Sequence, residues 1–475
     1  MTIEIKKGSI VEAEVDAVAF GGKGIARVGG MVLFIEGGLP GDKLRARVTR
    51  RKPQYGEAEL VELMEPSPAR RQWPCPVFGA CGGCKWQHYE YAQQIIAKQQ
   101  HVADSLKHIG KQHAYEMRPI LASPNEWFYR NKMEFSFGHD DDDNRIIIGF
   151  HRAGDFRRIV RAGEACQIQP PGMNEPMAWM EQRLNEEAAR EGDHFCNYNQ
   201  SRHIGFLRHL VVRHSYTTGH FLIAILTASG AWAGAEQFAT DFMHHFPMCR
   251  GFQWGTTDAL SDVARMEKQR LQRGEDSIEE RLGDKVFRVS TFSFFQTNTP
   301  GAKILYDVVR EFAELTGRET VLDAYCGTGT IGIYVSDRAA NVVGIELVKE
   351  AVWDARYNAK QNGAANCTFL AGEMRDVLPT LPSTLGTRFD RVIVDPPRGG
   401  MDKKSLRLLI EIGAPVLVYV SCNPSTLARD SVTLAESGYV AEVVQPVDMF
   451  PHTYHVESVI RFRKREPQAT AVATN

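Results

Sequence analysis

The sequence predicts a multidomain protein: an OB-like β-barrel at the N-terminus, an α+β middle domain, and a doubly wound, Rossmann-like α/β domain at the C-terminus. Three observations support this organisation. Short alternating strands with glycine-rich turns fill residues 1–66, mixed strands and helices occupy 67–290, and strands alternate with helices over 291–465. A chain of 475 residues is also long enough for about two to four domains.

Charge and composition exclude some kinds of protein. The chain has 56 Lys and Arg against 58 Asp and Glu, a formal net charge of −2, so any nucleic-acid site must be a local patch. No apolar run approaches the ~18 residues of a membrane span, and the opening residues lack the pattern of a secretion signal. We therefore expect a soluble cytoplasmic protein that does not associate with a membrane. No obligate protein partner is inferred.

The barrel prediction for residues 1–66 comes from alternating segments such as VEAEVDAV, MVLFIEG and KLRARVTR, separated by turns such as GGLPGD. The run from Lys43 to Lys52 carries six basic residues and no acid. Two interpretations of this run are equally good. It is either a solvated, charged edge strand or a surface that contacts an RNA backbone.

Residues 67–290 begin with a proline-rich linker and continue with mixed elements. A helix is predicted at about 89–110, where it could pack on the C-terminal domain. Alternating segments such as NKMEFSFG and HFLIAILT predict strands, with helices over MNEPMAWMEQRLNEEA and after Ala231. Residues 466–475 are predicted to be a disordered tail.

Four cysteines in this middle region have the spacing of metal ligands. Cys75, Cys81 and Cys84 form C-x5-C-x2-C in a Pro/Gly-rich loop, and Cys166 supplies a fourth thiol. Four thiolates suit zinc and a cubane iron–sulfur cluster equally well. The remaining cysteines of the chain without a partner at ligand spacing are interpreted as core residues: Cys196, Cys249 and Cys367.

A glycine-rich turn in the C-terminal domain predicts a cofactor site. The strand VLDAY runs into CGTGTIG, and Glu346 ends the next strand, where a carboxylate can accept both hydroxyls of a ribose. NAD and S-adenosylmethionine share this geometry, but the form DAYCGTG favours the second. Glu373 follows the third strand, either near an adenine amine or as an ordinary acid at a helix start.

Two further strand ends carry candidate chemistry. RVIVD places Asp395 before PPRGG at the ligand-binding edge of the sheet, a pattern that also occurs in amino-group methyltransferases. VYVSCNP places Cys422 at the end of the next strand, where a thiol is a candidate nucleophile. A lone cysteine is more often a buried apolar residue, but its position after a strand and before Asn-Pro favours the nucleophile.

Methylation at C5 of uracil fits this pair of motifs. Carbon 5 is a poor nucleophile, so a thiolate must first add to C6, and a base must later remove the C5 proton. Glu457, in HVES at the start of the last strand, is the candidate base. An acid that opens a core-facing segment is unusual unless it has a partner or a chemical role.

The chain resembles the RNA uridine-5-methyltransferase family, in particular its iron–sulfur members that carry a TRAM domain and act on 23S ribosomal RNA. The segments that carry the resemblance run along the whole chain: the N-terminal barrel, the cysteine motif, FFQTN, DAYCGTGT, DPPRGG, SCNPSTLARD and HVES.

The resemblance implies Cys422 as nucleophile, Glu457 as base and a [4Fe–4S] cluster rather than zinc on the four cysteines. It also implies a set of residues around S-adenosylmethionine: Gln296, Tyr325, Glu346 and Asp395. Thr330 and Glu373 occupy positions where relatives often have an amide or another acid. The RNA candidates lie in the YRN segment: Arg130, Asn131 and Lys132.

Other functions remain open at this point. The nearest is the same chemistry on the T-loop uridine of transfer RNA. A cytosine-5-methyltransferase would also use a cysteine, but normally after Pro or Thr. A different class is a non-catalytic RNA-binding or chaperone protein with a vestigial methyltransferase core, against which the intact Cys422, Glu457 and Asp395 argue.

Overall fold

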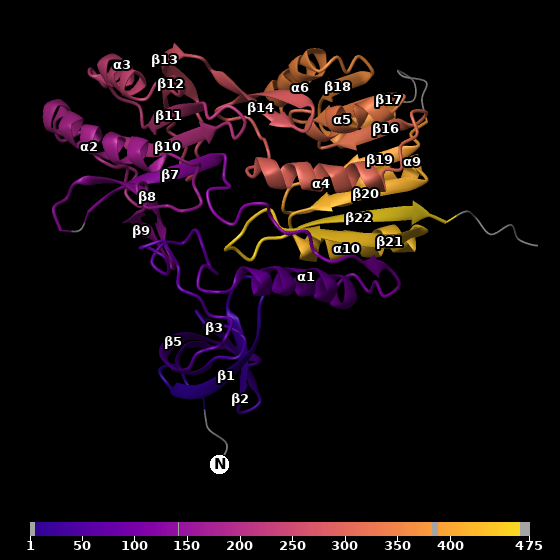
Figure 1. The fold of residues 1–475 in the computed structure, drawn as a ribbon, viewed down its shortest axis with the longest axis horizontal. Coiled ribbons are helices and arrows are strands. Elements are labelled where there is room, and N and C mark those ends of the chain that lie inside the picture. The colour runs from indigo at the N-terminus through magenta and orange to yellow at the C-terminus, as the bar shows by residue number, and fades with distance from the viewer. Residues whose placement is uncertain (1–4, 141, 382–387, 466–475) are drawn as a thin grey trace, which may run out of the picture.

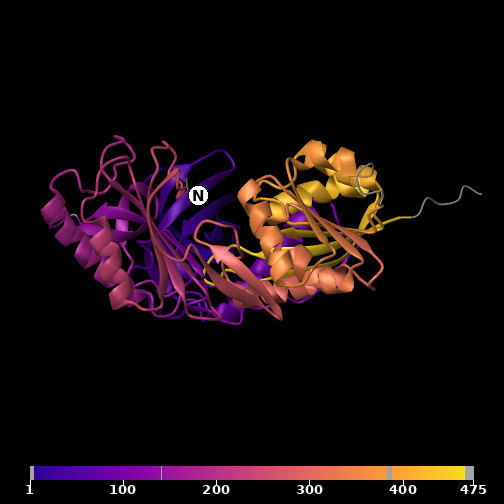
Figure 2. The ribbon, with the colours of Figure 1, turned by 90° about the horizontal axis from the view of Figure 1, so that it is seen from above.

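The computed structural model describes residues 5–140, 142–381 and 388–465, so the predicted tail at 466–475 lies outside the described residues. Three parts are visible in Figure 1: a small barrel below, a sheet with two helices at upper left, and a larger layered sheet at right. The two larger parts stand side by side when seen from above (Figure 2). None of the described helices has the length and apolar character to span a membrane.

The first five strands close into a barrel in the order β1-β2-β3-β5-β4. Strict alternation in β1 and β4 turns Val11, Val15 and Leu44 inward and their neighbours outward. The predicted N-terminal barrel is confirmed. Its strands are β1 (Ile10–Val18), β2 (Gly24–Val28), β3 (Met31–Glu36), β4 (Lys43–Arg51) and β5 (Tyr55–Glu65).

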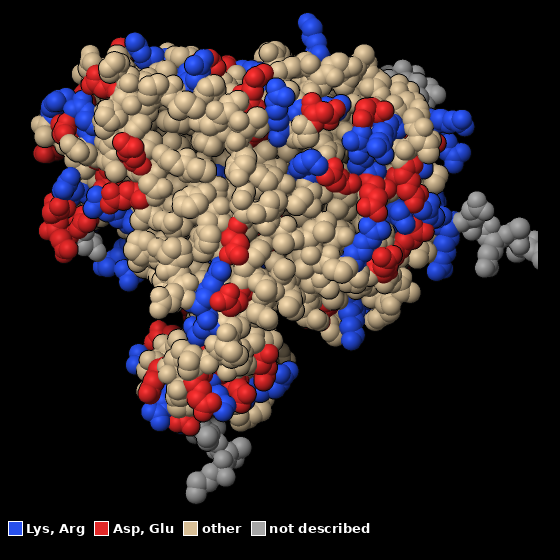
Figure 3. Space-filling view, viewed as in Figure 1, with Lys and Arg blue, Asp and Glu red and all other residues tan. Residues whose placement is uncertain are grey.

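Most of the basic run at Lys43 to Lys52 lies on the outer face of β4, beside acids of β1 and β5. The register places these side chains across from each other, and four of the six cations form ion pairs. The pairs are Lys43–Glu65 (2.8 Å), Arg45–Glu12 (3.0 Å), Arg47–Glu59 (3.1 Å) and Arg50–Glu57 (3.5 Å). Mixed red and blue on the barrel in Figure 3 shows the same interleaving of charge.

The middle part is built on a seven-stranded sheet in the order β13-β12-β11-β10-β7-β8-β9. Its central strands β10 and β11 are buried along their whole length, and helices α2 (Asn174–Glu191) and α3 (Ala235–His245) pack on one face. The strands are β7 (Lys132–His139), β8 (Ile146–Arg152), β9 (Asp155–Arg161), β10 (Leu207–His214), β11 (Phe221–Thr227), β12 (Cys249–Thr256) and β13 (Lys268–Gly274); a hairpin of β14 (Ser277–Leu282) and β15 (Lys285–Ser290) follows.

The C-terminal part is an eight-stranded sheet in the order β18-β17-β16-β19-β20-β22-β21-β6. Five neighbouring strands are parallel, and β22 runs antiparallel beside β20. Helices cover both faces, so the predicted doubly wound fold is confirmed. The strands are β16 (Thr320–Ala324), β17 (Asn341–Glu346), β18 (Cys367–Ala371), β19 (Arg391–Val394), β20 (Val416–Ser421), β21 (Tyr439–Val447) and β22 (Glu457–Lys464).

The two helical layers of this sheet have separate hydrophobic cores. One face packs on α4, α5 and α6, and the other on α1, α7, α9 and α10. The helices are α4 (Thr299–Phe312), α5 (Thr330–Val335), α6 (Lys349–Gln361), α7 (Met374–Val377), α9 (Lys403–Ile412) and α10 (Pro424–Glu436), with short 3-10 turns at Ser336–Arg338 and Leu378–Thr380.

A segment from the first third of the chain completes the C-terminal part. Helix α1 (Tyr91–His108) lies against α10, and β6 (Glu116–Met117) adds a parallel strand beside β21 (Figure 1). Lys98 on α1 forms a 2.7 Å ion pair with Asp448, and both side chains are fully buried. The Tyr91 hydroxyl donates to the same carboxylate at 2.9 Å. These contacts bind helix α1 to the loop that leads from β21 to β22.

Candidate active site

The turn between β16 and α5 has the backbone that its glycines predict. Tyr325, Gly327 and Gly329 all have positive φ angles, of 64°, 52° and 76°. A side chain at Gly329 would place its Cβ 2.7 Å from Cζ of Phe369. Both the positive φ angle and this close contact therefore require glycine at position 329. The result is a tight turn with exposed backbone at the carboxyl edge of the sheet.

Glu346 ends β17 and reaches this turn. One carboxylate oxygen accepts from Gly327 N at 3.1 Å and the other from Val348 N at 2.9 Å. Glu373 follows β18 at the same edge, at the N-terminus of α7, and forms an ion pair with Arg375. The register of β17 with β18 sets Glu346 beside Ala371, so both predicted acids border one site.

Thr330 and Tyr325 direct their side chains away from the turn. The Thr330 hydroxyl is buried and hydrogen-bonded to the hydroxyl of Tyr306 at 3.0 Å. Tyr325 packs against the second hydrophobic core, near Ser405 of α9, and burial raises its pKa to about 12. In this structure the two residues brace the cofactor turn on opposite sides.

Asp395 and Gln296 meet at the middle of the edge. Asp395 follows β19, whose Val394 is level with Ala324 of β16 and Tyr419 of β20. The Gln296 amide donates to the Asp395 carboxylate at 3.4 Å. Burial raises the pKa of Asp395 to about 6, and the Gln296 hydrogen bond opposes part of that shift.

Cys422 and Glu457 approach each other because of the register between β20 and β22. The last paired residues are Ser421 and Ser458; Cys422 directly follows the first and Glu457 directly precedes the second. In an antiparallel pair such residues lie opposite each other. Glu457 is only 3% exposed, and Cys422 is partly buried.

Burial and mutual repulsion raise the pKa values of these groups. The pKa of Glu457 rises to about 8, first through burial and then through Asp395. The pKa of Cys422 rises to about 12, through burial and then through Glu457 and Asp395. The guanidinium of Arg398 acts in the other direction on both groups. The thiol and the two carboxyl groups thus lie close enough to repel one another when charged, and Arg398 opposes that repulsion.

Hydrogen bonds join the turn after β19 to the turn after β20. The Asn423 side-chain amide donates to Arg398 O at 3.1 Å, and its oxygen caps α10 at Ser425 N. The Thr426 hydroxyl also donates to Arg398 O, at 3.3 Å. The Asn-Pro that follows Cys422 therefore both starts a helix and holds the turn that carries Arg398.

The three YRN residues occupy different environments. Asn131 is buried, with its amide donating to Gln296 O at 2.8 Å and to the Thr299 hydroxyl at 2.9 Å. Lys132 pairs with Glu134 at 2.6 Å. The guanidinium of Arg130 lies near both Cys84 and His455, since it shifts the pKa of each downward. Asn131 thus ties the middle sheet to Gln296, whereas Arg130 lies between the cysteines and the loop before Glu457.

The four predicted cysteine ligands are neighbours in the structure. Burial and the two neighbouring thiols Cys166 and Cys81 raise the pKa of Cys84 to about 12. Burial, Cys81 and Cys75 likewise raise the pKa of Cys166 to about 11. Across the described residues, no three His, Cys, Asp or Glu side chains are arranged to hold a metal ion. A metal centre therefore stays a prediction.

Two residues at this edge were not singled out from the sequence. Arg398 lowers the pKa of both Cys422 and Glu457, and in the DPPRGG motif it directly follows the two prolines. Phe294 is 62% exposed and lies beside the cofactor turn, 3.7 Å from a Cβ built at Gly327. The FFQTN segment was the signal, since an exposed aromatic two residues before a site amide is unusual.

Comparisons with known proteins agree with this geometry. The family model "tRNA (Uracil-5-)-methyltransferase" matches residues 257–465, and the TRAM domain model matches residues 4–61. An RNA methyltransferase of Halalkalibacterium halodurans is 37% identical over 455 residues, covering 96% of this chain and 97% of the relative. An RNA methyltransferase of Caldanaerobacter subterraneus is 38% identical over 463 residues, with 95% and 98% covered.

A solved structure shows the same architecture. The crystal structure of the Pyrococcus abyssi tRNA (uracil-54, C5)-methyltransferase, in complex with S-adenosyl-L-homocysteine, has 28% sequence identity and a TM-score of 0.73. The match covers 95% of this chain and 100% of that one. The similarity therefore includes the barrel, the middle sheet and the C-terminal sheet.

Fold, site and relatives define the protein as an S-adenosylmethionine-dependent RNA methyltransferase. Within that class, the chain belongs to the RNA uracil-5-methyltransferase family and carries a TRAM domain at its N-terminus. The family predicted from the sequence is confirmed. The ribosomal substrate and the iron–sulfur cluster are narrower predictions and belong to the proposal that follows.

Proposed function

We propose that the protein methylates C5 of a uridine in 23S ribosomal RNA, with Cys422 as nucleophile and Glu457 as base. The observation that carries the residue roles is the register of β20 with β22, which sets the thiol opposite a buried carboxyl group. Asp395 and Gln296 stand beside them at the same strand ends. The substrate RNA implies a cytoplasmic location.

The residues at the glycine turn fit S-adenosylmethionine. Glu346 anchors the turn through two backbone N–H groups and keeps oxygen lone pairs for ribose hydroxyls. Glu373, at the end of the neighbouring strand, is placed for the adenine. Gln296 and Asp395 would hold the methionine end, while Tyr325 and Thr330 would act by bracing the turn. The cofactor, when bound, supplies an electrophilic methyl group.

The chain's own groups then account for each step at the uracil. The Cys422 sulfur forms a bond to C6 and its thiol proton passes to solvent, which leaves an enolate with nucleophilic character at C5. After C5 has accepted the methyl group, Glu457 removes the C5 proton. The electrons of that C–H bond restore the C5–C6 double bond, and the bond from C6 to sulfur breaks. Arg398 favours the anionic forms of both Cys422 and Glu457.

The chemistry and proximity of the four cysteines, rather than a preformed ligand geometry, support the proposal of a [4Fe–4S] cluster. The cysteines are gathered in one place, Gly83 N donates to the Cys81 sulfur at 3.4 Å, and backbone N–H groups of Ile168 and Gln169 donate to Cys166. Hydrogen bonds to sulfur are a known feature of iron–sulfur sites. We infer a structural role, with zinc as the weaker alternative. Iron and sulfide analysis of anaerobically purified protein, with Cys84→Ser as comparison, tests this directly.

Transfer RNA is the second candidate substrate. The Pyrococcus abyssi protein is described as acting on uracil 54 of tRNA, and the matching family model bears a tRNA name. The proposal favours ribosomal RNA because the TRAM barrel and the four-cysteine set occur together in this chain, a combination that resembles the ribosomal enzymes.

Transfer of a labelled methyl group tests the proposal. The anaerobically purified protein is incubated with labelled S-adenosylmethionine and with unmodified 23S ribosomal RNA or transfer RNA, and the product nucleoside is identified. We expect label in 5-methyluridine of ribosomal RNA. Label in transfer RNA alone would establish the second candidate, and absence of label from both RNAs would overturn the proposal.

A further inference from the structure

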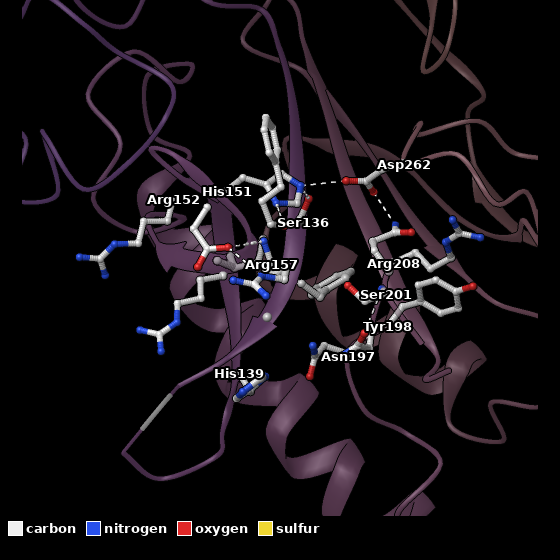
Figure 4. Close-up of a pocket in the computed structure, with 18 of the residues that line it drawn as sticks. Ser136, His139, His151, Arg152, Arg157, Asn197, Tyr198, Ser201, Arg208 and Asp262 are labelled. Carbon is white, nitrogen blue, oxygen red and sulfur yellow. Dashed lines mark hydrogen bonds and ion pairs between the residues drawn. The ribbon is translucent and has the colours of Figure 1, made fainter. Parts of the chain in front are cut away.

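A cavity of about 610 Å³ lies on the middle sheet, away from the residues at the active-site edge. It is formed by the β7, β8 and β9 strands, the turn at 197–202 and the loop at Asp262 (Figure 4). That volume is in the range of small-molecule pockets and accommodates a nucleotide. Nothing in the methylation chemistry uses this cavity.

The lining is strongly basic. Five of its residues are arginines: Arg152, Arg157, Arg158, Arg202 and Arg208. The two acids of the lining already have partners within it, because Asp155 contacts Arg157 at 3.3 Å and Asp262 contacts His151 at 2.9 Å. For Arg152 and Arg202 no ion pair is found among the described residues, and both are exposed. The cavity therefore offers fixed positive charge to an anion.

Arg208 and Tyr198 form a rigid wall of the cavity. Arg208 is 3% exposed, and its guanidinium lies 4.3 Å from the centre of the Tyr198 ring. Its terminal nitrogens donate to Thr257 O at 2.7 Å and Ser261 O at 3.2 Å. Its buried Nε has no hydrogen-bond partner among the described residues. The hydrogen-bond acceptors of this buried guanidinium are neutral carbonyls, and the nearby carboxylate of Asp258 is exposed, so the cavity wall favours negative charge.

Phe156 stands at the rim among the arginines. It is 81% exposed, more than any other large hydrophobic side chain among the described residues. The centre of its ring lies 5.8 Å from the centre of the His151 ring. A single exposed apolar side chain is ordinary on a protein surface, so what distinguishes this ring is its position in the lining of a basic cavity. Aromatic rings interleaved with arginines are typical of sites where unpaired bases stack and phosphates pair.

We propose that this cavity binds one unpaired nucleotide of the substrate RNA, distinct from the uridine that is methylated. Arg152 and Arg202 contact its flanking phosphates, and its base stacks on Phe156. The inference rests on the proposed function, since it names a second contact with the same RNA. A single-stranded segment is favoured over a duplex because a stacked base must leave its helix.

Hydrogen bonds hold the cavity at a fixed position relative to the active site. The β8–β9 hairpin is joined to the cysteine loop by Gly82 N to His151 O at 3.0 Å and by Ala153 N to Ala80 O at 2.8 Å. The same loop is joined to His452, shortly before Glu457, through Lys85 N at 2.8 Å. A nucleotide in the cavity and a uracil at Cys422 are therefore held at a defined separation.

The test compares RNA affinity with catalysis. We expect Phe156→Ala to raise the Kd for a ribosomal RNA substrate about tenfold, from loss of one stacked base. The double variant R152A/R202A should weaken binding similarly and reduce the salt slope of log K by about 1.4, for two lost phosphate contacts on a single strand. Methyl transfer at saturating RNA should remain unchanged in both.

Matched controls lie on the surface away from the cavity. Ile96→Ala removes an exposed apolar side chain of α1, and Arg407→Ala removes an exposed arginine of α9; neither should alter affinity. Thermal unfolding confirms that all variants are folded. Unchanged Kd and salt slope in the cavity variants would overturn this inference while labelled 5-methyluridine still forms. Failure of the wild-type protein to methylate any RNA would instead overturn the proposed function.

Discussion

The active-site edge and the arginine cavity both concentrate charge, but they differ in which charges they bury and pair. At the edge, Glu457 and Asp395 are held together with little compensation, and both pKa values are raised. In the cavity, Arg152 and Arg202 are exposed, and an arginine guanidinium keeps its charge in proteins. Groups that must exchange a proton are thus buried near like charges, whereas groups that only attract an anion stay in contact with water.

This difference predicts that variants at the two places separate catalysis from binding. The largest effect is expected from Cys422→Ala, which removes the nucleophile. Methyl transfer should fall on the order of 10⁴-fold or more, while RNA affinity changes less than about twofold. Single-turnover methylation and a binding titration measure the two quantities.

Covalent trapping of a modified RNA identifies which cysteine is the nucleophile. RNA containing 5-fluorouridine should form a covalent adduct with the wild-type protein and with Cys196→Ala. The interpretation of Cys196 as a core residue was wrong, because this cysteine is exposed, and it therefore serves as the control thiol. The same RNA should form no adduct with Cys422→Ala. An adduct with that variant would show that another residue is the nucleophile.

The next largest effect is expected from Glu457→Gln, which keeps the shape of the base but cannot accept a proton. Turnover should fall about 10²–10⁴-fold, and the covalent RNA adduct should accumulate with the natural uridine, because the C5 proton cannot leave. Denaturing gels of labelled RNA detect the adduct. Rapid turnover without an adduct would remove Glu457 from the mechanism.

The raised pKa of Glu457 predicts that the reaction rate depends on pH, with an effect smaller than that of the two substitutions above. A base with a pKa of about 8 is mostly protonated below that pH and gains its active form as pH rises. The rate at which the covalent adduct breaks down to 5-methyluridine in a single turnover should therefore rise about tenfold per pH unit below pH 8 and level off above it, because Cys422 is already bonded to C6 at that step. RNA affinity titrated over the same range separates an effect of pH on catalysis from an effect on binding. A profile that is already flat from pH 6 would contradict the buried, protonated state of Glu457.

The placement of a residue is predicted well from sequence where the residue lies at the end of a strand. The glycine turn, Asp395, Cys422 and Glu457 each follow or begin a strand, and the parallel sheet brings strand ends to one edge by topology alone. Asn131 shows the limit of this reasoning. It lies in a segment of basic and aromatic residues that resembles an RNA contact, yet its amide is buried on Gln296 and Thr299.

The arginine cavity could not be predicted in this way. Its residues come from β7, the β8–β9 hairpin, the turn at 197–202, Arg208 on β10 and Asp262, and no local pattern joins these five segments. The addition of α1 and β6 to the C-terminal sheet could not be predicted for the same reason. Strand β6 pairs with β21, and most of the chain lies between them. Contacts between residues so distant in sequence depend on packing rather than on local periodicity.

The basic run of the barrel is a second arginine-rich surface to compare with the cavity, and its substitution is expected to have the smallest effect on RNA affinity. Arg45 and Arg47 look like an RNA-binding strand in the sequence, but both pair with glutamates on the neighbouring strands, unlike Arg152 and Arg202. Exposed pairs of this kind contribute about 0.2–1 kcal/mol to stability, and the acids cancel their field.

We therefore expect R45A/R47A to change the RNA affinity less than about twofold and to leave the free energy of unfolding nearly unchanged. Titration of the same ribosomal RNA and urea unfolding measure the two values, with R152A/R202A as the comparison. A tenfold loss of affinity in the barrel variant would mean that RNA displaces these glutamates. Paired arginines would then bind RNA as well as unpaired ones, and pairing within the protein would no longer distinguish the two surfaces.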